Sequence, residues 1–283
     1  KITNDNREVL FSKRFVVYED IVNIPIQVKR GREIKTIDQV QNLDFSVRIG
    51  EQQLQNPVKN IQLAILQNGK WHTAKRNIKP QYTLGNDLIY KYDKETQFYG
   101  GNEFLYFDNN NIRVNTNNIA RVTSGDLYNV WLYTNTPRNR SLYTFFPDIN
   151  GNFQVRNNNN ENPDLEADYA WVYFSLDELE LNNKSIYVTG MFNNYMLTDE
   201  NKMTFNKKTK KYEVAMLIKQ GFTNFEYTLV NNSNRLIDEE NAIDGNFFQT
   251  ENKYTILAYY KGNNDRFYRV IGKGDASSTN IIN

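Results

Sequence analysis

The stretch DYAWVYFSL, residues 168–176, decides the fold class of this chain. Its side chains alternate between two sides, with Tyr169, Trp171 and Tyr173 on one and Ala170, Val172, Phe174 and Leu176 on the other. A two-residue period is typical of a β-strand. Because both sides are apolar, we expect both faces of this strand to be covered.

Further strand-like segments fill the second half of the chain, each rich in aromatic or β-branched residues. They are SIYVTG (185–190), KYEVAMLIK (211–219), FEYTLVN (225–231), KYTILAYY (253–260) and RFYRVI (266–271). Polar turn formers separate them. Strands at this spacing over about 110 residues are typical of an immunoglobulin-like sandwich. We predict such a domain over residues 165–273, followed by a flexible tail over residues 274–283.

The first half carries the same kind of pattern. Leu43, Phe45, Val47 and Ile49 alternate with polar residues, and Ile61, Leu63 and Ile65 repeat the alternation. Further strands are expected at residues 88–92, 104–107, 127–133 and 142–146. Pro25 lacks a backbone N–H, which predicts that the stretch around it lies at a sheet edge or a crossover. These strands predict a middle β-sandwich domain over residues 21–156.

Two segments mark the expected domain boundaries. Residues 157–164 are rich in Asn and contain no apolar side chain apart from Pro163, which predicts a linker. Residues 9–18 form a short apolar run, and the chain begins at Lys1 and not at Met. We therefore interpret residues 1–20 as the closing strand of an N-terminal domain that is missing from the chain. The predicted architecture is all-β, with two successive antiparallel β-sandwich domains.

Composition excludes several partners. The chain has 34 basic and 33 acidic residues and a formal net charge of +1, so no basic field attracts nucleic acid. It has no cysteine, which removes disulfides, iron–sulfur sites and thiolate chemistry. No apolar run approaches the roughly 18 residues of a membrane-spanning helix. We predict no nucleic-acid partner and no transmembrane segment.

Residues for catalysis are scarce. His72 is the only histidine, so a histidine-based metal site or a serine triad would depend on this one ring. The acidic run at residues 238–240 is interpreted as a solvated loop. Gly100 and Gly101 lack the Lys and Ser/Thr spacing of a phosphate-binding loop. We expect no enzyme, no metal and no cofactor, although two carboxylates that meet only in space would leave glycoside hydrolysis open.

The segment QFYGGNEFLYFD, residues 97–108, holds the most informative motif. Two glycines between aromatic residues predict a bulge or a tight crossing where only backbone fits. A structural role and a functional role explain this motif equally well. Its five central residues, structural or interacting, are Gly100, Gly101, Asn102, Glu103 and Phe104.

Several motifs together resemble the type IX secretion system plug protein family of Bacteroidetes. In the first half they are SKRFVVYED (12–20), NPVKNIQLAILQNGKW (56–71) and FYGGNEFLYFD (98–108). In the second half they are ADYAWVYFSL (167–176), IYVTGMFNNY (186–195), YEVAMLIKQGFTNFEYTLV (212–230), DGNFFQTENKYTILAYY (244–260) and DRFYRVIG (265–272). The resemblance covers nearly the whole chain, in order and in spacing.

The resemblance implies a non-enzymatic interaction protein of the periplasm that is associated with the outer membrane. Members of this family dock on the giant translocon β-barrel of the outer membrane and seal its pore on the periplasmic side. They also carry a first domain before the region that this chain matches. A broad, flat interface rich in aromatic residues would suit such docking.

A second resemblance concerns the C-terminal half alone, which is similar to glycogen-binding modules of the early-set sandwich class. It implies an alternative function, a carbohydrate-binding module that recognises α-glucans. Tyr195 stands where the modules carry a tryptophan that stacks on sugar, and would be the remnant of a glycan platform. Two other features depart from the pattern: Thr228 replaces a basic residue, and residues 234–246 hold no aromatic residue.

Overall fold

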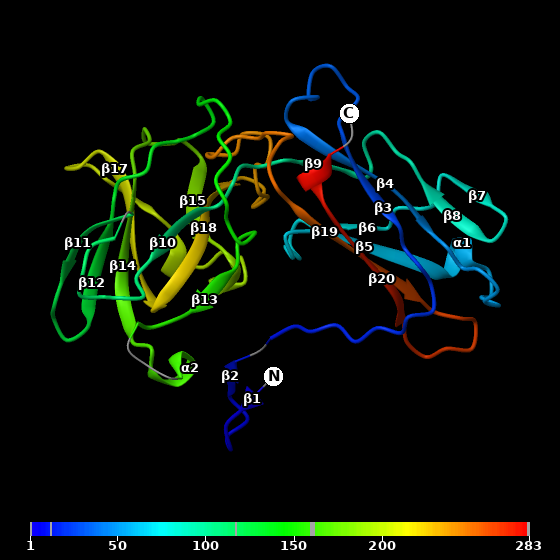
Figure 1. Ribbon diagram of the computed structural model, residues 1–283, viewed down its shortest axis with the longest axis horizontal. Helices are drawn as coiled ribbons and strands as arrows, with labels where there is room; N and C mark the ends of the chain where they lie inside the picture. The colour runs from blue at the N-terminus through cyan, green and yellow to red at the C-terminus, as the bar shows by residue number, and fades with distance from the viewer. Residues whose placement is uncertain (1, 12, 117, 159–161, 282–283) are drawn as a thin grey trace.

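The computed structural model describes residues 2–11, 13–116, 118–158 and 162–281. These residues form two β-sandwiches that lie side by side (Figure 1). Each sandwich has its own cluster of buried apolar side chains, and the two clusters share no residue. The prediction of an all-β sandwich fold is confirmed.

The first sandwich consists of two sheets with α1 (Pro57–Asn60) at one end. One sheet has the order β3 (Ile26–Arg30), β4 (Val40–Val47), β8 (Asp87–Tyr90) and β7 (Tyr82–Leu84), with β9 (Gln97–Tyr99) also paired to β4. The other has the order β20 (Arg269–Ser277), β19 (Lys253–Tyr260), β5 (Ile61–Gln67) and β6 (Lys75–Arg76). Strand β3 lies at an edge, as Pro25 predicts.

The second sandwich also has two sheets. One is built on β18 (Gly221–Asn231), which pairs with β10 (Leu105–Asp108), β13 (Phe153–Val155) and β15 (Lys184–Thr189). The other has the order β11 (Ile119–Thr123), β12 (Tyr128–Leu132), β14 (Tyr169–Leu176), β17 (Lys211–Lys219) and β16 (Thr204–Asn206). Strands β12 and β14 pair in parallel, and the other pairings in this sheet are antiparallel. Short helices α2 (Pro163–Glu166), η1 (Met191–Asn193) and η2 (Asp199–Asn201) lie in its connections, and η3 (Ser278–Asn280) follows β20.

The expected order of the domains along the chain is wrong. Strand β19 pairs with β5 from Tyr254 opposite Gln67 to Tyr260 opposite Ile61. The last two strands therefore complete the first sandwich, and the second sandwich is inserted between β9 and β19. The predicted domain boundaries 21–156 and 165–273 are wrong, because a two-residue period identifies a strand but does not show which strand it pairs with.

Two predicted flexible segments also have other roles. Residues 157–164 do not separate domains, because they connect β13 to β14 inside the second sandwich; residues 159–161 of this segment lie outside the described residues. The tail at 274–283 is paired through Ser277, and Ser278 is buried. Gly274 allows this, because a Cβ there would lie 2.4 Å from the carbonyl oxygen of Ile24. Residues 282–283 are outside the described part.

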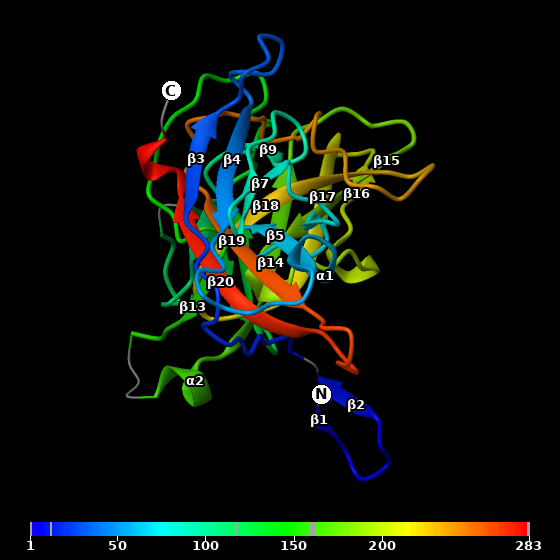
Figure 2. The ribbon, with the colours of Figure 1, turned by 90° about the vertical axis from the view of Figure 1, so that its right-hand side faces the viewer.

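The N-terminal region contains a small hairpin of β1 (Ile2–Thr3) and β2 (Val9–Phe11), which projects from the sandwiches (Figure 2). The predicted strand over 9–18 is therefore shorter than expected. Beyond it the chain is extended, and the Glu19 N–H donates to the carbonyl oxygen of Val270 across 2.8 Å. Its role as the closing strand of another domain stays a prediction. Residues 142–146 form no strand, contrary to expectation.

Candidate binding surface

The motif at residues 100–104 lies where the chain passes from the first sandwich to the second. A Cβ on Gly100 would lie 2.0 Å from the carbonyl oxygen of Phe247, so only glycine fits against this backbone. Gly101 has φ +65°, in the left-handed region that favours glycine. The predicted tight crossing is therefore present, and the backbone that Gly100 crosses belongs to the distant segment around Phe247.

The next two motif residues, Asn102 and Glu103, stabilise the same crossing. The Asn102 side-chain amide donates to the carbonyl oxygen of Asp244 across 2.8 Å. The buried Glu103 carboxylate accepts from the Tyr143 hydroxyl and from the Glu251 N–H. Burial raises the pKa of Glu103 above its ordinary value. These contacts favour a structural role for the motif.

Tyr195 also lies where the two sandwiches meet, a region called the junction below, but it cannot serve as a glycan platform. Its side chain is only 3% exposed, so no sugar ring can stack on it. Lys70 lies 5.2 Å from the Tyr195 ring centroid and pairs with the Glu226 carboxylate at 2.7 Å, which joins the two sandwiches. Burial raises the pKa of Tyr195 well above its ordinary value. The expected stacking role of Tyr195 is wrong.

Exposed aromatic side chains gather on the outer surface of the sheet β11–β12–β14–β17–β16. The prediction that both faces of residues 168–176 are covered fails here. Val172 and Phe174 are buried in the core, whereas Tyr169 is 49% and Trp171 is 40% exposed. Six outward side chains of this sheet, called the aromatic face below, are Arg121, Trp131, Tyr169, Trp171, Tyr173 and Leu217.

One row of this face is a stack that runs across the strands. Register places Arg121, Trp131, Tyr173 and Ala215 opposite one another on β11, β12, β14 and β17. The Arg121 guanidinium lies 3.9 Å from the Trp131 ring centroid. The rings of Trp131 and Tyr173 are 4.7 Å apart and 12° from parallel. Neighbouring strands are about 4.8 Å apart, so the sheet itself sets this stacking distance.

A second part of the face is more exposed and mainly apolar. We call Tyr169, Trp171 and Leu217 the apolar patch. Trp171 lies directly opposite Leu217, and Leu217 is 47% exposed. Lys219 lies at the border, with its ammonium 5.8 Å from the Tyr169 ring centroid. Aromatic and aliphatic side chains that meet on a flat exposed sheet are the usual centre of a protein interface.

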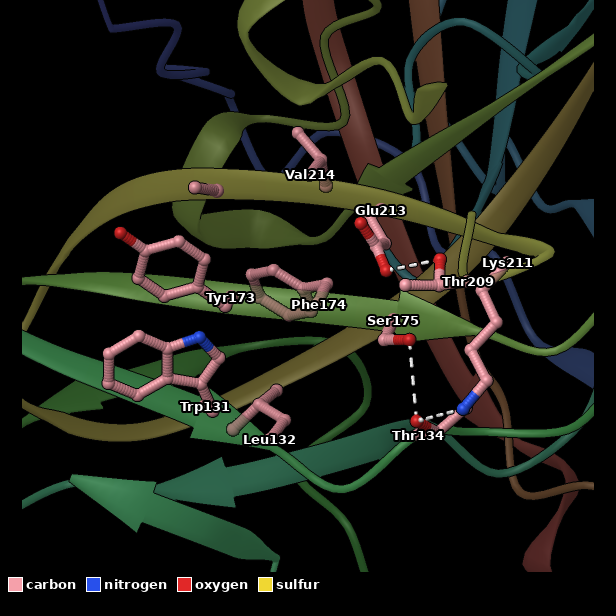
Figure 3. Close-up of a pocket in the computed structure, with 11 residues that line it drawn as sticks. Trp131, Leu132, Thr134, Tyr173, Phe174, Ser175, Thr209, Lys211, Glu213 and Val214 are labelled. Carbon is pink, nitrogen blue, oxygen red and sulfur yellow. Dashed lines mark hydrogen bonds between the residues drawn. The ribbon is translucent and has the colours of Figure 1, made fainter. Parts of the chain in front are cut away.

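A groove of about 530 Å³ opens beside the stack (Figure 3). Trp131 and Tyr173 lie at one end, with Ala215 opposite Tyr173 on the next strand, and the other end is polar. There the Lys211 ammonium lies 3.2 Å from the Thr134 hydroxyl, which in turn lies 3.3 Å from that of Ser175. The Thr209 hydroxyl donates to the Glu213 carboxylate across 2.8 Å. The groove thus combines an aromatic wall with hydroxyl, amine and carboxylate groups.

The groups considered for catalysis or metal binding in the sequence, His72 and the acidic run at residues 238–240, do not line this groove. Within residues 2–11, 13–116, 118–158 and 162–281, no three His, Cys, Asp or Glu side chains gather in a way that could hold a metal ion. His72 lies beside Tyr195, with ring centroids 5.9 Å apart. In the acidic run at residues 238–240, Asp238 forms an ion pair with Lys184 at 2.8 Å. No helix in the described part of the chain has the length and apolarity needed to cross a membrane.

Comparison with known proteins finds a similar solved structure. No protein-family model and no curated protein matches this chain. A crystal structure of a hypothetical protein from Parabacteroides merdae ATCC 43184 is similar, with 30% sequence identity and a TM-score of 0.87. The similarity covers 92% of this chain and 66% of that one. The double-sandwich fold is therefore present in a solved protein that is longer than this chain.

Proposed function

We propose that this chain is a non-enzymatic component of the type IX protein secretion system. It docks on the giant translocon β-barrel of the outer membrane and seals the pore on the periplasmic side. The proposal rests on the resemblance in sequence, which extends over nearly the whole chain. The similar solved protein comes from a Bacteroidetes species, which is compatible with a secretion system of that phylum.

The apolar patch carries the docking part of the proposal. Tyr169, Trp171 and Leu217 expose 49%, 40% and 47% of their surface, although all three lie on paired strands of a well-packed sandwich. Strand pairing already orders the backbone that carries these side chains, so docking adds little cost in backbone conformational entropy. Tryptophan and tyrosine also dominate the energetic centres of protein interfaces. The patch therefore suits a flat protein surface.

The proposal sets a location as well as a partner. The protein works in the periplasm and is held at the outer membrane through the translocon. Its place at the membrane is peripheral. Salt extraction and detergent extraction of envelopes would separate this arrangement from direct insertion into the lipid.

Co-purification with the translocon tests the proposal. The full-length protein, tagged and expressed in its own cells, is expected to co-purify with the giant barrel from solubilised envelopes. Trp171→Ala combined with Leu217→Ala should reduce the recovered barrel about tenfold or more, because hot-spot truncations each cost about 2 kcal/mol or more. Phe267→Ala is the matched control, since Phe267 is 70% exposed on the other sandwich. Absence of the barrel from the wild-type sample would refute the docking function.

The α-glucan alternative loses the residue on which it rested. Tyr195 is buried beneath Lys70, and its hydroxyl lies within the junction between the sandwiches. A stacking platform there would require the junction to open. Affinity for sugars through Tyr195 is therefore not retained as a function of this chain.

A further inference from the structure

The stack on the aromatic face ends at a short side chain. Arg121, Trp131 and Tyr173 occupy three successive strands, and Ala215 occupies the fourth. The methyl group of Ala215 is too short to cover a ring that stands upright beside it. Strand β16 begins at Thr204 opposite Glu213, so within the described residues it does not extend to Ala215. The side of the Tyr173 ring turned away from Trp131 consequently faces the groove (Figure 3).

The position above Ala215 has the dimensions of one ring. Each strand step in this sheet is about 4.8 Å, and the Trp131 and Tyr173 rings already stack at 4.7 Å. A ring placed over Ala215 would meet Tyr173 at the same distance. The Tyr173 hydroxyl lies 3.1 Å from the Asn129 side-chain oxygen, so the ring is held in place before any ligand arrives. Preorganisation of this kind lowers the cost of binding.

The polar end of the groove restricts the class of ligand. It offers the hydroxyls of Thr134, Ser175 and Thr209 together with the Lys211 ammonium and the Glu213 carboxylate. These groups include donors and acceptors, and the two charges offset each other. A phosphate or other anion would meet the Glu213 carboxylate. A purely apolar side chain would leave the polar end without partners.

We propose that this groove binds a neutral sugar ring of an oligosaccharide. The C–H face of a pyranose ring lies over Ala215 against Tyr173, and the ring hydroxyls exchange hydrogen bonds with Lys211, Glu213 and Thr209. The volume of about 530 Å³ falls within the usual range of small-molecule sites. The groove is open, so a sugar chain can extend beyond it. This site is independent of the docking function and uses none of the apolar patch.

Titration with defined oligosaccharides tests the site. Chitotetraose, cellotetraose and maltotetraose are titrated into the chain, with tryptophan fluorescence and isothermal calorimetry as readouts. At least one sugar is expected to bind with a dissociation constant in the millimolar range or tighter. Tyr173→Ala should weaken binding about tenfold, equivalent to about 1.4 kcal/mol. Trp171→Ala, which alters the neighbouring row, should leave the affinity within about twofold.

A second variant distinguishes loss of the site from loss of the fold. Ala215→Phe adds a ring where the sugar is expected and so completes the stack from within the chain. It should abolish sugar binding while the circular dichroism spectrum and unfolding midpoint stay near those of the wild type. The proposal is overturned if no sugar binds the wild type at 10 mM, about the weakest affinity worth detecting, or if Ala215→Phe binds as well as the wild type.

The outcome also separates this site from the docking function. Loss of barrel co-purification in Ala215→Phe, with no sugar bound by the wild type, would assign the groove to the protein interface and overturn the sugar proposal. Sugar binding in a protein that never recovers the barrel would support the groove and refute docking. Sugar titration therefore tests the groove, and co-purification tests docking, independently of each other.

Discussion

The Asn252 side-chain amide donates to the carbonyl oxygen of Gly100 across 2.8 Å, and both residues are buried. Asn252 directly precedes β19, whereas Gly100 lies at the passage into the second sandwich. The same amide donates to the Gln41 side-chain oxygen, and the Asn252 side-chain oxygen accepts from Asn68 across 2.7 Å. One side chain therefore holds the point where the chain leaves the first sandwich and the point where it returns.

Replacing Asn252 by Ala should destabilise the whole chain. The variant leaves the Gly100 carbonyl and the Asn68 amide without this partner in a buried site, whereas the Gln41 oxygen still accepts from the Tyr254 hydroxyl. A buried polar group left unpaired costs about 1–3 kcal/mol. We expect a loss of about 3 kcal/mol in the free energy of unfolding, measured with urea. Asn263→Ala, in an exposed turn, should change it by less than about 0.5 kcal/mol. Equal values for both variants would contradict the role given to Asn252.

The strands were more predictable than their assembly. Alternation identified β4, β5 and β14 in the sequence, because one buried face imposes a two-residue period. The same pattern also marked β19, but it could not show that β19 pairs with β5 across about 190 residues of chain. Such pairings depend on interior contacts that no local pattern contains. Sequence order then led to a wrong domain division.

The paired glycines of the junction should respond differently to alanine. Gly100→Ala places a methyl group against the Phe247 carbonyl, which is backbone and cannot rotate away. The cost should exceed about 2 kcal/mol, as for overpacking elsewhere. A Cβ on Gly101 meets nothing within 4 Å, and its φ of +65° alone sets the penalty. Gly101→Ala should cost about 1 kcal/mol, so chemical denaturation must rank Gly100→Ala as the more damaging variant.

The ion pair of Lys70 with Glu226 should matter more than exposed pairs. The two side chains are 14% and 23% exposed and come from different sandwiches. Lys70→Met leaves a partly buried carboxylate unpaired, so we expect a loss of about 2 kcal/mol. Lys94→Met is the matched control, because Lys94 pairs with Glu33 at the same 2.7 Å but is 71% exposed. In thermal unfolding, the control should lose less than about 0.5 kcal/mol of unfolding free energy. A similar loss in both variants would contradict the role given to the Lys70–Glu226 pair.

The aromatic face was only half visible in the sequence. Tyr169, Trp171 and Tyr173 occur on one side of a strand, which was interpreted as a second covered face. The same alternation also fits a strand whose second apolar face is exposed and available for binding. Arg121 and Ala215 belong to the stack only through strand register, one through β11 and the other through β17. Their spacing in the sequence carries no signal of this.

Glu103 should give the chain a distinct dependence of stability on pH. Burial raises the pKa of this carboxyl in the folded state above its ordinary value of 4.5, although hydrogen bonds from Tyr143 and Glu251 oppose the rise. The folded chain therefore holds the proton more tightly than the unfolded chain. Stability from this group is fully present below pH 4.5 and is lost as the pH rises through the folded pKa.

Comparison with Glu103→Gln isolates this effect from other titrating groups, Asp148 among them. Gln keeps an acceptor oxygen for Tyr143 and for the Glu251 N–H but has no proton to lose. We expect the unfolding free energy of the wild type, minus that of the variant, to fall as the pH rises from 4.5 toward 7 and then to level off. Urea titrations at half-unit pH intervals measure this difference. A constant difference would mean that the folded and unfolded chains hold this proton equally, and a difference that grows with pH would mean that the junction stabilises the Glu103 carboxylate; either result would contradict the prediction.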